Sequence, residues 1–321
     1  MTKQILGIHH ITAIAGDPQT NIDFYAGVLG LRLVKVTVNF DDPGTYHLYY
    51  GDGVGHPGTI LTFFPWPNAP NGRPGTGQVS ETAFSIPESA AQYWEERLRD
   101  SGVACEKLSR FGEAVILFAD PDGMRIELVA SKSAPAGRAY GEGAIPQEYA
   151  IRGFHSATLR ESDPRRTAEL LTGTMGFELV EQDGNRSRYA AKSGEPANLV
   201  DVLAAPDERP GRVLRGTVHH IAWRTPDAAQ QIAWQEALSA KHYGVSPVMD
   251  RKYFHSIYYR EPGGILFEIA TDPPGFTVDQ SLEELGSRLV LPAWLEPDRA
   301  KLEQVLPPLQ LPAIRTAEVR S

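Results

Sequence analysis

The sequence predicts an α+β fold in which four βαβββ modules form two domains of curved, incompletely closed mixed sheets with flanking helices. Two observations lead to this prediction. A short alternating strand recurs four times, roughly 70 residues apart, and each copy continues into a helix of about three turns, a glycine and further strands. Each copy has one helix and several strands, which excludes a helical solenoid.

Each copy has its own start and stop signals for one helix. The helices are expected to begin at Asp17-Pro18, Pro87, Asp163-Pro164 and Thr225-Pro226, and to end at Gly30, Gly102, Gly176 and Gly244. Proline fits the first turn of a helix and glycine terminates it, so each pair brackets one helix. The position of the second residue of the first strand's His-His pair is occupied in turn by His10, Glu81, His155 and His220.

The repeats also suggest where domains begin and end. Two modules fall in residues 1–130 and two in residues 151–275, so each range is predicted to be one domain. Residues 131–150 are rich in Ser, Ala, Gly and Pro and lack an apolar period, which is typical of a linker. Residues 276–321 are expected to form a tail packed over the domains, with a short helix near Arg299 to Val305.

Composition excludes several classes of protein. Among 321 residues, 31 Lys and Arg stand against 40 Asp and Glu, and the formal net charge is −9. No block of positive charge is present, so neither nucleic acid nor an anionic membrane is an expected partner. The longest apolar runs fall far short of the ~20 residues that a membrane helix needs.

The N-terminus and the cysteine content bear on location. The chain enters a strand-like segment soon after Met1, without the apolar stretch of a secretory signal. Its single cysteine, Cys105, cannot form an internal disulfide, which is typical of a reducing compartment. We therefore expect a cytoplasmic protein in which Cys105 is a small buried apolar residue.

Three side chains in the first and fourth copies suggest a metal site. Side chains alternate along a strand, so His10 shares a face with Thr12, and His220 occupies the matching position of copy four. Glu268 lies in an apolar strand that closes copy four, and a buried carboxylate is costly unless a cation offsets it. Two imidazoles and one carboxylate form the facial triad of non-haem Fe(II) oxygenases, which leaves open coordination positions.

A second triad, His155 with His220 and Glu268, stays open from the residues alone. The choice depends on which copies pair in space, and copy one shares the fuller His-His-Ile text with copy four, which favours His10. Glu81, Glu127 and His155 could form a mirrored second site, but solvated or structurally paired side chains are the favoured interpretation.

The sequence resembles the vicinal oxygen chelate superfamily, and within it the ring-cleaving dioxygenases of the hydroquinone 1,2-dioxygenase type. The resemblance covers nearly the whole chain and rests on residues 7–12, 218–222 and 262–268, which read Gly-Ile-His-His-Ile-Thr, Val-His-His-Ile-Ala and Pro-Gly-Gly-Ile-Leu-Phe-Glu. It implies metal ligands at His10, His220 and Glu268, with Fe(II) as the expected metal and Mn(II) as the alternative. The implied reactants are a hydroquinone- or catechol-type aromatic and O2.

The same resemblance implies active-site neighbours at His9, Thr12, Tyr258 and Arg251. Tyr258 and His9 are expected to transfer protons or to donate hydrogen bonds, and Arg251 to hold an anionic ring oxygen. At one point the chain departs from the family pattern. The family has an acidic residue shortly before the tyrosine, and this chain has His255 there. That departure bears on which ring substituents are accepted.

Other histidines and other functions complete the expectations. His47, His56 and His242 lack a repeat partner and are expected to be structural or surface residues, whereas His255 is expected behind the site. A glyoxalase-like isomerase or lyase would need a fourth protein ligand, and a non-catalytic small-molecule-binding resistance protein would need no metal triad. The sequence leaves open whether the chain forms a homo-oligomer.

Overall fold

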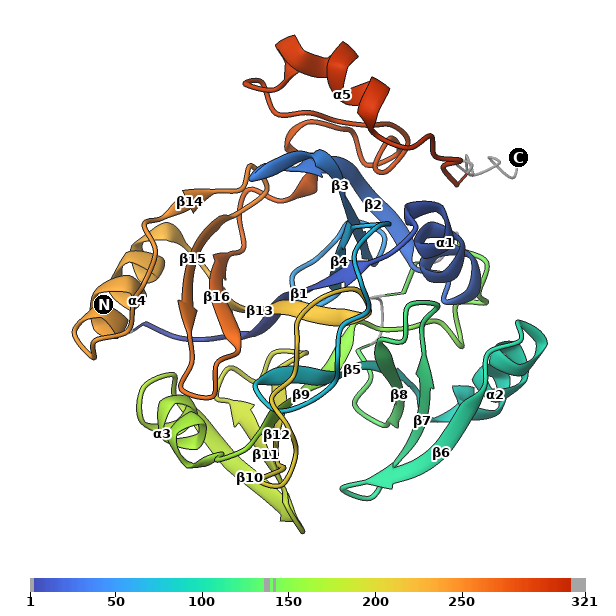
Figure 1. Ribbon diagram of the computed structural model, residues 1–321. Coiled ribbons are helices and arrows are strands. Elements are labelled where there is room, and N and C mark those ends of the chain that lie inside the picture. Colours follow the sequence, from blue (N-terminus) through green and yellow to red (C-terminus); the bar gives the residue numbers. More distant parts are fainter. Residues whose placement is uncertain (1–2, 136–138, 141–142, 313–321) are drawn as a thin grey trace.

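The computed structural model describes residues 3–135, 139–140 and 143–312, and it contains the four predicted βαβββ modules (Figure 1). Module 1 comprises β1 (Gly7–Ala15), α1 (Pro18–Ile22) with a π-helical continuation (Asp23–Val28), β2 (Arg32–Asn39), β3 (Asp42–Gly51) and β4 (Ile60–Pro65). Module 2 comprises β5 (Gln78–Pro87), a 3₁₀ turn (Glu88–Ala90), α2 (Ala91–Asp100), β6 (Cys105–Arg110), β7 (Glu113–Ala119) and β8 (Arg125–Ser131).

Modules 3 and 4 repeat the same order. Module 3 comprises β9 (Phe154–Glu161), α3 (Arg165–Gly173), β10 (Phe177–Asp183), β11 (Arg186–Ala191) and β12 (Leu199–Ala204). Module 4 comprises β13 (Thr217–Thr225), α4 (Ala228–Ser239), β14 (Met249–Asp250), β15 (His255–Arg260) and β16 (Leu266–Thr271). The predicted fold class is confirmed.

The modules pair to form two curled mixed sheets. One sheet has the order β14-β15-β16-β13-β1-β4-β3-β2, and the other β10-β11-β12-β9-β5-β8-β7-β6. Module 1 thus joins module 4 through antiparallel β1 and β13, and module 2 joins module 3 through β5 and β9. Each of the predicted ranges 1–130 and 151–275 contributes one module to the first sheet and one to the second. That these ranges are domains stays a prediction.

The helix starts agree with the sequence in part. In module 1 the Asp17 carboxylate caps the helix by accepting the backbone N–H of Thr20, as predicted. In module 4 the helix begins later than Thr225-Pro226, because Thr225 still belongs to β13 and Asp227 is the residue that caps α4. Tertiary strand pairing therefore overrides the local proline signal there.

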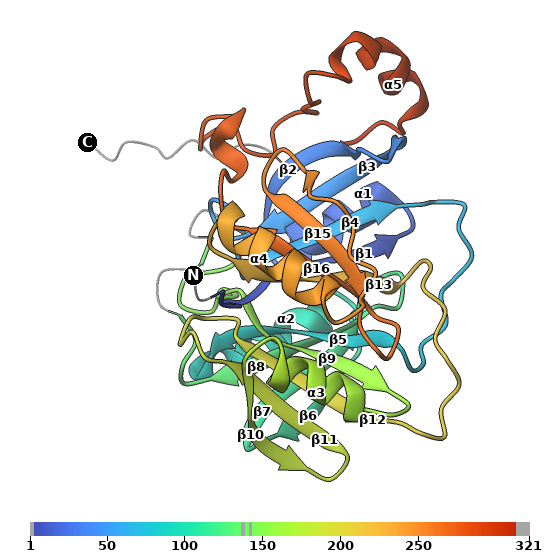
Figure 2. The same ribbon diagram turned by 90° about the vertical axis from the view of Figure 1, so that its left-hand side faces the viewer.

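The predicted linker and the predicted tail differ in their structure. Past Ser131, the described residues of 131–150 form neither helix nor strand. Helix α5 (Arg299–Val305) occupies its predicted position, and the tail lies over β2 and β3 (Figure 2). Lys35 of β2 donates hydrogen bonds to Asp279 and Gln280 of the tail. These bonds attach the tail to the first module.

Cys105 is exposed, so the prediction that it is buried was wrong. It opens β6, the last strand of its sheet, where most side chains face solvent. An alternating edge strand leaves half of its residues outside the core whatever their type. Within the described ranges, no helix is long and apolar enough to cross a membrane.

Two glutamates are buried where module 3 meets module 4. Glu161 is 1 % exposed and Glu261 is 2 % exposed. Glu261 accepts hydrogen bonds from Thr167 and from the backbone of Ile265, whereas Oε1 of Glu161 has no donor among the described residues. Burial, reinforced by the Glu261 carboxyl group, raises the pKa of Glu161 to about 8. Glu161 therefore keeps its proton at neutral pH.

This proton makes stability depend on pH. A raised pKa in the folded chain gives stability that is present below the ordinary value of 4.5 and is lost as the pH rises to about 8. We expect Glu161→Gln to avoid that loss, so the free energy of unfolding, measured by urea titration, shifts in the variant's favour as the pH rises. Exposed Glu88→Gln should show no such trend. If the free energy of unfolding of the variant differed from that of the parent by the same amount at every pH, Glu161 would not be the group that keeps a proton in the folded chain.

Candidate metal centre and active-site cavity

Three ligand-type side chains converge inside the first sheet. His10 lies on β1, His220 on β13 and Glu268 on β16, and these strands are neighbours in the order β16-β13-β1. The Nε2 atoms of the two histidines are 3.3 Å apart, and Glu268 Oε2 is 3.0 Å from His220 Nε2 and 3.4 Å from His10 Nε2. All three residues are buried, and their ligand atoms lie within 4.8 Å of one another.

The electrostatics of this cluster favour a cation. Burial raises the pKa of Glu268, but His10 and His220 outweigh burial and hold it well below its ordinary range. Burial lowers the pKa of His220, and Glu268 offsets this only in part. Ser256 donates a hydrogen bond to Oε1 of Glu268, whereas Oε2 receives none from the described residues. A buried carboxylate oxygen facing two imidazoles fits the donor set of a divalent metal ion.

The histidine preceding each candidate ligand orients that ligand's ring. Nδ1 of His9 lies 2.9 Å from Nδ1 of His10, and Nδ1 of His219 lies 2.8 Å from Nδ1 of His220. A histidine that binds a metal through Nε2 needs a free lone pair there, so its proton is on Nδ1. The Nδ1–H group then donates a hydrogen bond to the neighbouring imidazole. Burial, with a smaller effect of the adjacent histidine, lowers the pKa of His219 to about 3 and that of His9 well below its ordinary value. Both therefore stay neutral acceptors.

A cavity of about 310 Å³ opens beside the cluster. Its lining residues are His10, Asn39, Phe40, Asp41, His47, Tyr49, Phe64, Trp66, His219, His220, Arg251, Phe254, Tyr258 and Leu266. Arg251 donates from Nε to Tyr258 Oη at 3.1 Å and forms an ion pair with Asp41 at 3.0 Å. Burial, and to a lesser extent Glu268, raises the pKa of Tyr258, so its hydroxyl stays protonated.

The predicted active-site neighbours divide into two groups. Tyr258 and Arg251 line the cavity. His9 lies behind His10 with its ring against Phe254, and Thr12 shares a hydrogen bond of 2.8 Å with Thr62; neither lines the cavity. The structure thus places two of the four beside the open space and two behind it.

His47, expected to be structural or at the surface, lines the cavity together with Tyr49. The Tyr49 hydroxyl lies 2.8 Å from Nδ1 of His47, and Thr62 Oγ1 lies 2.9 Å from Nε2. Burial, followed by the charges of His10 and His220, holds the pKa of His47 well below its ordinary value. Alternation along β3 puts His47 and Tyr49 on one face, a signal that the search for repeat partners missed.

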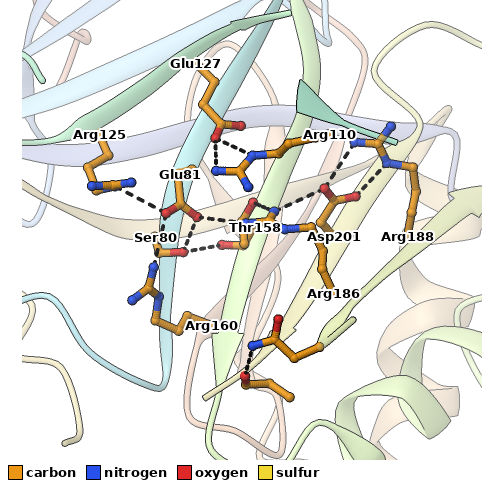
Figure 3. Close-up of polar contacts among 12 residues, drawn as sticks. Ser80, Glu81, Arg110, Arg125, Glu127, Thr158, Arg160, Arg186, Arg188 and Asp201 are labelled. Carbon is orange, nitrogen blue, oxygen red and sulfur yellow. Dashed lines mark hydrogen bonds and ion pairs between the residues drawn. The ribbon is translucent and has the colours of Figure 1, made fainter. Parts of the chain in front are cut away.

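The alternative ligand His155 lies in the other sheet. Its Nε2 is 3.1 Å from a carboxylate oxygen of Glu113. Figure 3 shows arginine side chains in contact with three other carboxylates of this sheet, those of Glu81, Glu127 and Asp201. Five guanidinium groups pair with five carboxylates there: Arg110 with Glu127, Arg125 and Arg160 with Glu81, Arg160 also with Glu208, Arg186 and Arg188 with Asp201, and Arg188 also with Glu113. Glu81 and Glu127 are thus paired with arginines, as the favoured interpretation expected.

Two curled sheets, each joining two βαβββ modules, with a His-His-Glu cluster inside one of them, define the class of this protein. The family model "Glyoxalase/Bleomycin resistance protein/Dioxygenase superfamily" matches residues 7–128 and 153–269. The chain therefore belongs to this superfamily, and the resemblance stated from its sequence is confirmed.

Several known proteins are similar to the chain. "Putative ring-cleaving dioxygenase MhqO" of Bacillus subtilis is 50 % identical over 311 residues, 97 % of this chain and 99 % of that protein. "Chlorohydroquinone/hydroquinone 1,2-dioxygenase" of Sphingobium indicum is 35 % identical over 305 residues, 92 % and 94 % of the two chains.

Solved structures extend the comparison. A "putative dioxygenase" from Bacillus subtilis superposes with a TM-score of 0.93 at 49 % identity, covering 96 % of this chain and 99 % of that one. Glyoxalase I of Zea mays superposes with a TM-score of 0.63 at 14 % identity, covering 84 % and 93 %. The second likeness is one of fold alone.

The paired histidines lead to a prediction about metal affinity. We expect His9→Ala and His219→Ala each to weaken binding of a divalent metal to the metal-free protein roughly 10- to 100-fold, because the ligand ring loses the acceptor that fixes it. Competition with a chromogenic chelator measures the affinity. His242→Asn, at an exposed residue, is the matched control. Unchanged affinity in folded variants would refute the orienting role.

Proposed function

We propose that the chain is a cytoplasmic, non-haem Fe(II)-dependent, ring-cleaving dioxygenase that uses O2 on hydroquinone- or catechol-type aromatics. The observation that carries this proposal is the buried Glu268 carboxylate facing His10 and His220 beside an aromatic-lined cavity. The names of relatives with 35–50 % identity, a hydroquinone 1,2-dioxygenase and ring-cleaving dioxygenases, support the same reaction.

His10, His220 and Glu268 would hold the metal. When bound there, Fe(II), or Mn(II) as the alternative, would supply open coordination positions and the redox chemistry that lets O2 react with an aromatic ring. Imidazole and carboxylate ligands suit either metal, and His9 and His219 would fix the two ligand rings through their Nδ1 atoms.

The remaining cavity residues would position the ring and handle its protons. Phe40, Phe64 and Phe254 provide apolar walls for one aromatic ring. Arg251 would hold an anionic ring oxygen, and the protonated Tyr258 hydroxyl would donate a hydrogen bond or a proton to the developing oxygen charge. The Tyr49–His47 pair provides a second hydroxyl backed by a neutral imidazole.

Opening the ring adds both atoms of O2 to the substrate. We infer cleavage of the extradiol type, between the carbon that carries the metal-facing hydroxyl and a neighbour that carries none. Both hydroquinones and catechols possess such a bond, so one geometry of binding serves both substrate classes.

The alternatives have weaker support. An isomerase of the glyoxalase type would need a fourth protein ligand, and within the described part of the chain the cluster has three members. A resistance protein that only sequesters small molecules would gain nothing from a buried carboxylate between two imidazoles, which is costly to maintain without a cation.

Substitution of Glu268 tests the proposal directly. Glu268→Gln keeps the shape but removes the negative charge, so we expect loss of bound iron and a fall in O2 uptake on hydroquinones and catechols to the background rate. Elemental analysis and an oxygen electrode provide the two measurements. Glu178→Gln, at a side chain that is 62 % exposed, should alter neither. The proposal would be falsified if uptake persisted without metal, or if the unaltered protein consumed no O2 with any dihydroxybenzene.

Tyr258 can be tested separately from the metal. Tyr258→Phe removes only the hydroxyl that Arg251 contacts, so we expect kcat to fall roughly 100-fold while iron content stays normal. Steady-state O2 uptake separates kcat from KM, and Tyr189→Phe, in the other sheet, is the control. A kcat close to that of the parent would rule out proton or hydrogen-bond donation by this hydroxyl.

A further inference from the structure

A second cavity, which we call the side chamber, adjoins the active-site cavity where the two sheets meet. Its volume is about 260 Å³. Trp66, His219 and Leu266 line both spaces and so form a wall that the two cavities share. Because His219 also contacts the candidate ligand His220, the side chamber begins directly behind the metal centre.

The walls of the side chamber combine apolar and polar groups, and the apolar side chains come from both sheets. Ile14, Val218 and Ile265 of the first sheet face Val79 of β5, and each of the four is at most 5 % exposed. Val213 closes the outer end from the connection between β12 and β13. This connection pairs with the one that follows β4 through Arg73 and Arg212, and the two run side by side in Figure 2.

Two polar side chains of the side chamber, Gln78 and Arg260, can donate hydrogen bonds. Gln78 is 4 % exposed, and its Nε2 has no partner among the described residues. The Arg260 guanidinium lines the same space and donates one hydrogen bond to the carbonyl of Gly264. A buried amide N–H without an acceptor costs free energy, so a ligand that brings an acceptor to this point would be favoured.

We propose that the side chamber holds a substituent of the aromatic substrate: an alkyl chain on the dihydroxybenzene ring that ends in a carboxylate. The inference rests on the proposed function. The ring lies in the main cavity, the chain passes the wall of Trp66 and His219 into apolar surroundings, and the carboxylate accepts hydrogen bonds from Gln78 and Arg260.

Three probes test the chain and its end group. We would compare hydroquinone, butylhydroquinone and dihydroxyphenylbutanoate, with Kd from anaerobic calorimetry and kcat and KM from O2 uptake. Each methylene that enters an apolar site tightens binding roughly three- to four-fold. The butyl chain should therefore lower Kd and KM well over 10-fold with kcat unchanged, and the carboxylate should lower them further.

Two variants test the walls. Val213→Trp fills the chamber from a residue that is 37 % exposed, so the fold should tolerate it, and Val305→Trp on α5 is the matched control. It should raise KM for both chain-bearing probes at least 10-fold and leave hydroquinone unaffected. Gln78→Leu should abolish the advantage of the carboxylate over the plain butyl chain, whereas Gln92→Leu, on α2 and away from the chamber, should not.

The outcomes separate this inference from the proposed function. Turnover of hydroquinone with no gain from either chain, or a Val213→Trp effect equal on all three probes, would overturn the side chamber and leave the dioxygenase standing. Absence of turnover with every probe would count against the dioxygenase itself. In that case tighter anaerobic binding of the chain-bearing probes, lost in Val213→Trp, would still support the chamber.

Discussion

The site depends on the burial of one carboxylate. Glu268 is fully buried on β16, and two imidazoles face it from the neighbouring strands β13 and β1. The pairing of module 1 with module 4 is what brings His10, more than 200 positions earlier in the chain, to within hydrogen-bond distance of His220. Had adjacent modules paired instead, Glu81 of module 2 would be next to β1, and His155 of module 3, in place of His10, would be the histidine brought beside His220. Sheet topology therefore determines the chemistry.

The second sheet shows what the same scaffold does without that face. Glu81, Glu127 and Asp201 are buried there as well, but guanidinium groups neutralise them. A buried carboxylate must be balanced either by fixed cations from the chain or by a cation from solution. Arginine provides the first solution in one sheet. Among the described residues, Glu268 has ion-pair contacts with histidines alone, which leaves room for the second solution in the other sheet. The two halves are thus electrostatic alternatives built on one fold.

Much of the fold and of the candidate site was predictable because the sequence repeats its motifs. The modules, the His-His pairs and Glu268 recur at fixed places, so the fold and the converging triad followed from the sequence. His47 and Tyr49 were missed since they have no repeat partner, and only strand alternation with knowledge of the sheet's curvature puts them in the cavity. Cys105 was misjudged because nothing local shows that β6 is a sheet edge. His9 and Thr12 share a strand with His10, but which residues reach open space is a tertiary property.

His219 connects the candidate metal centre with the side chamber. Its Nδ1 faces the candidate ligand His220, and its ring forms part of the wall toward the side chamber. Any group that displaces this wall would therefore displace a residue that contacts the candidate ligand His220. His219 lines the active-site cavity as well as the side chamber, so the same side chain borders both spaces. Under the proposed function, recognition of a substituent and orientation of the candidate ligand His220 would be coupled through the imidazole of His219.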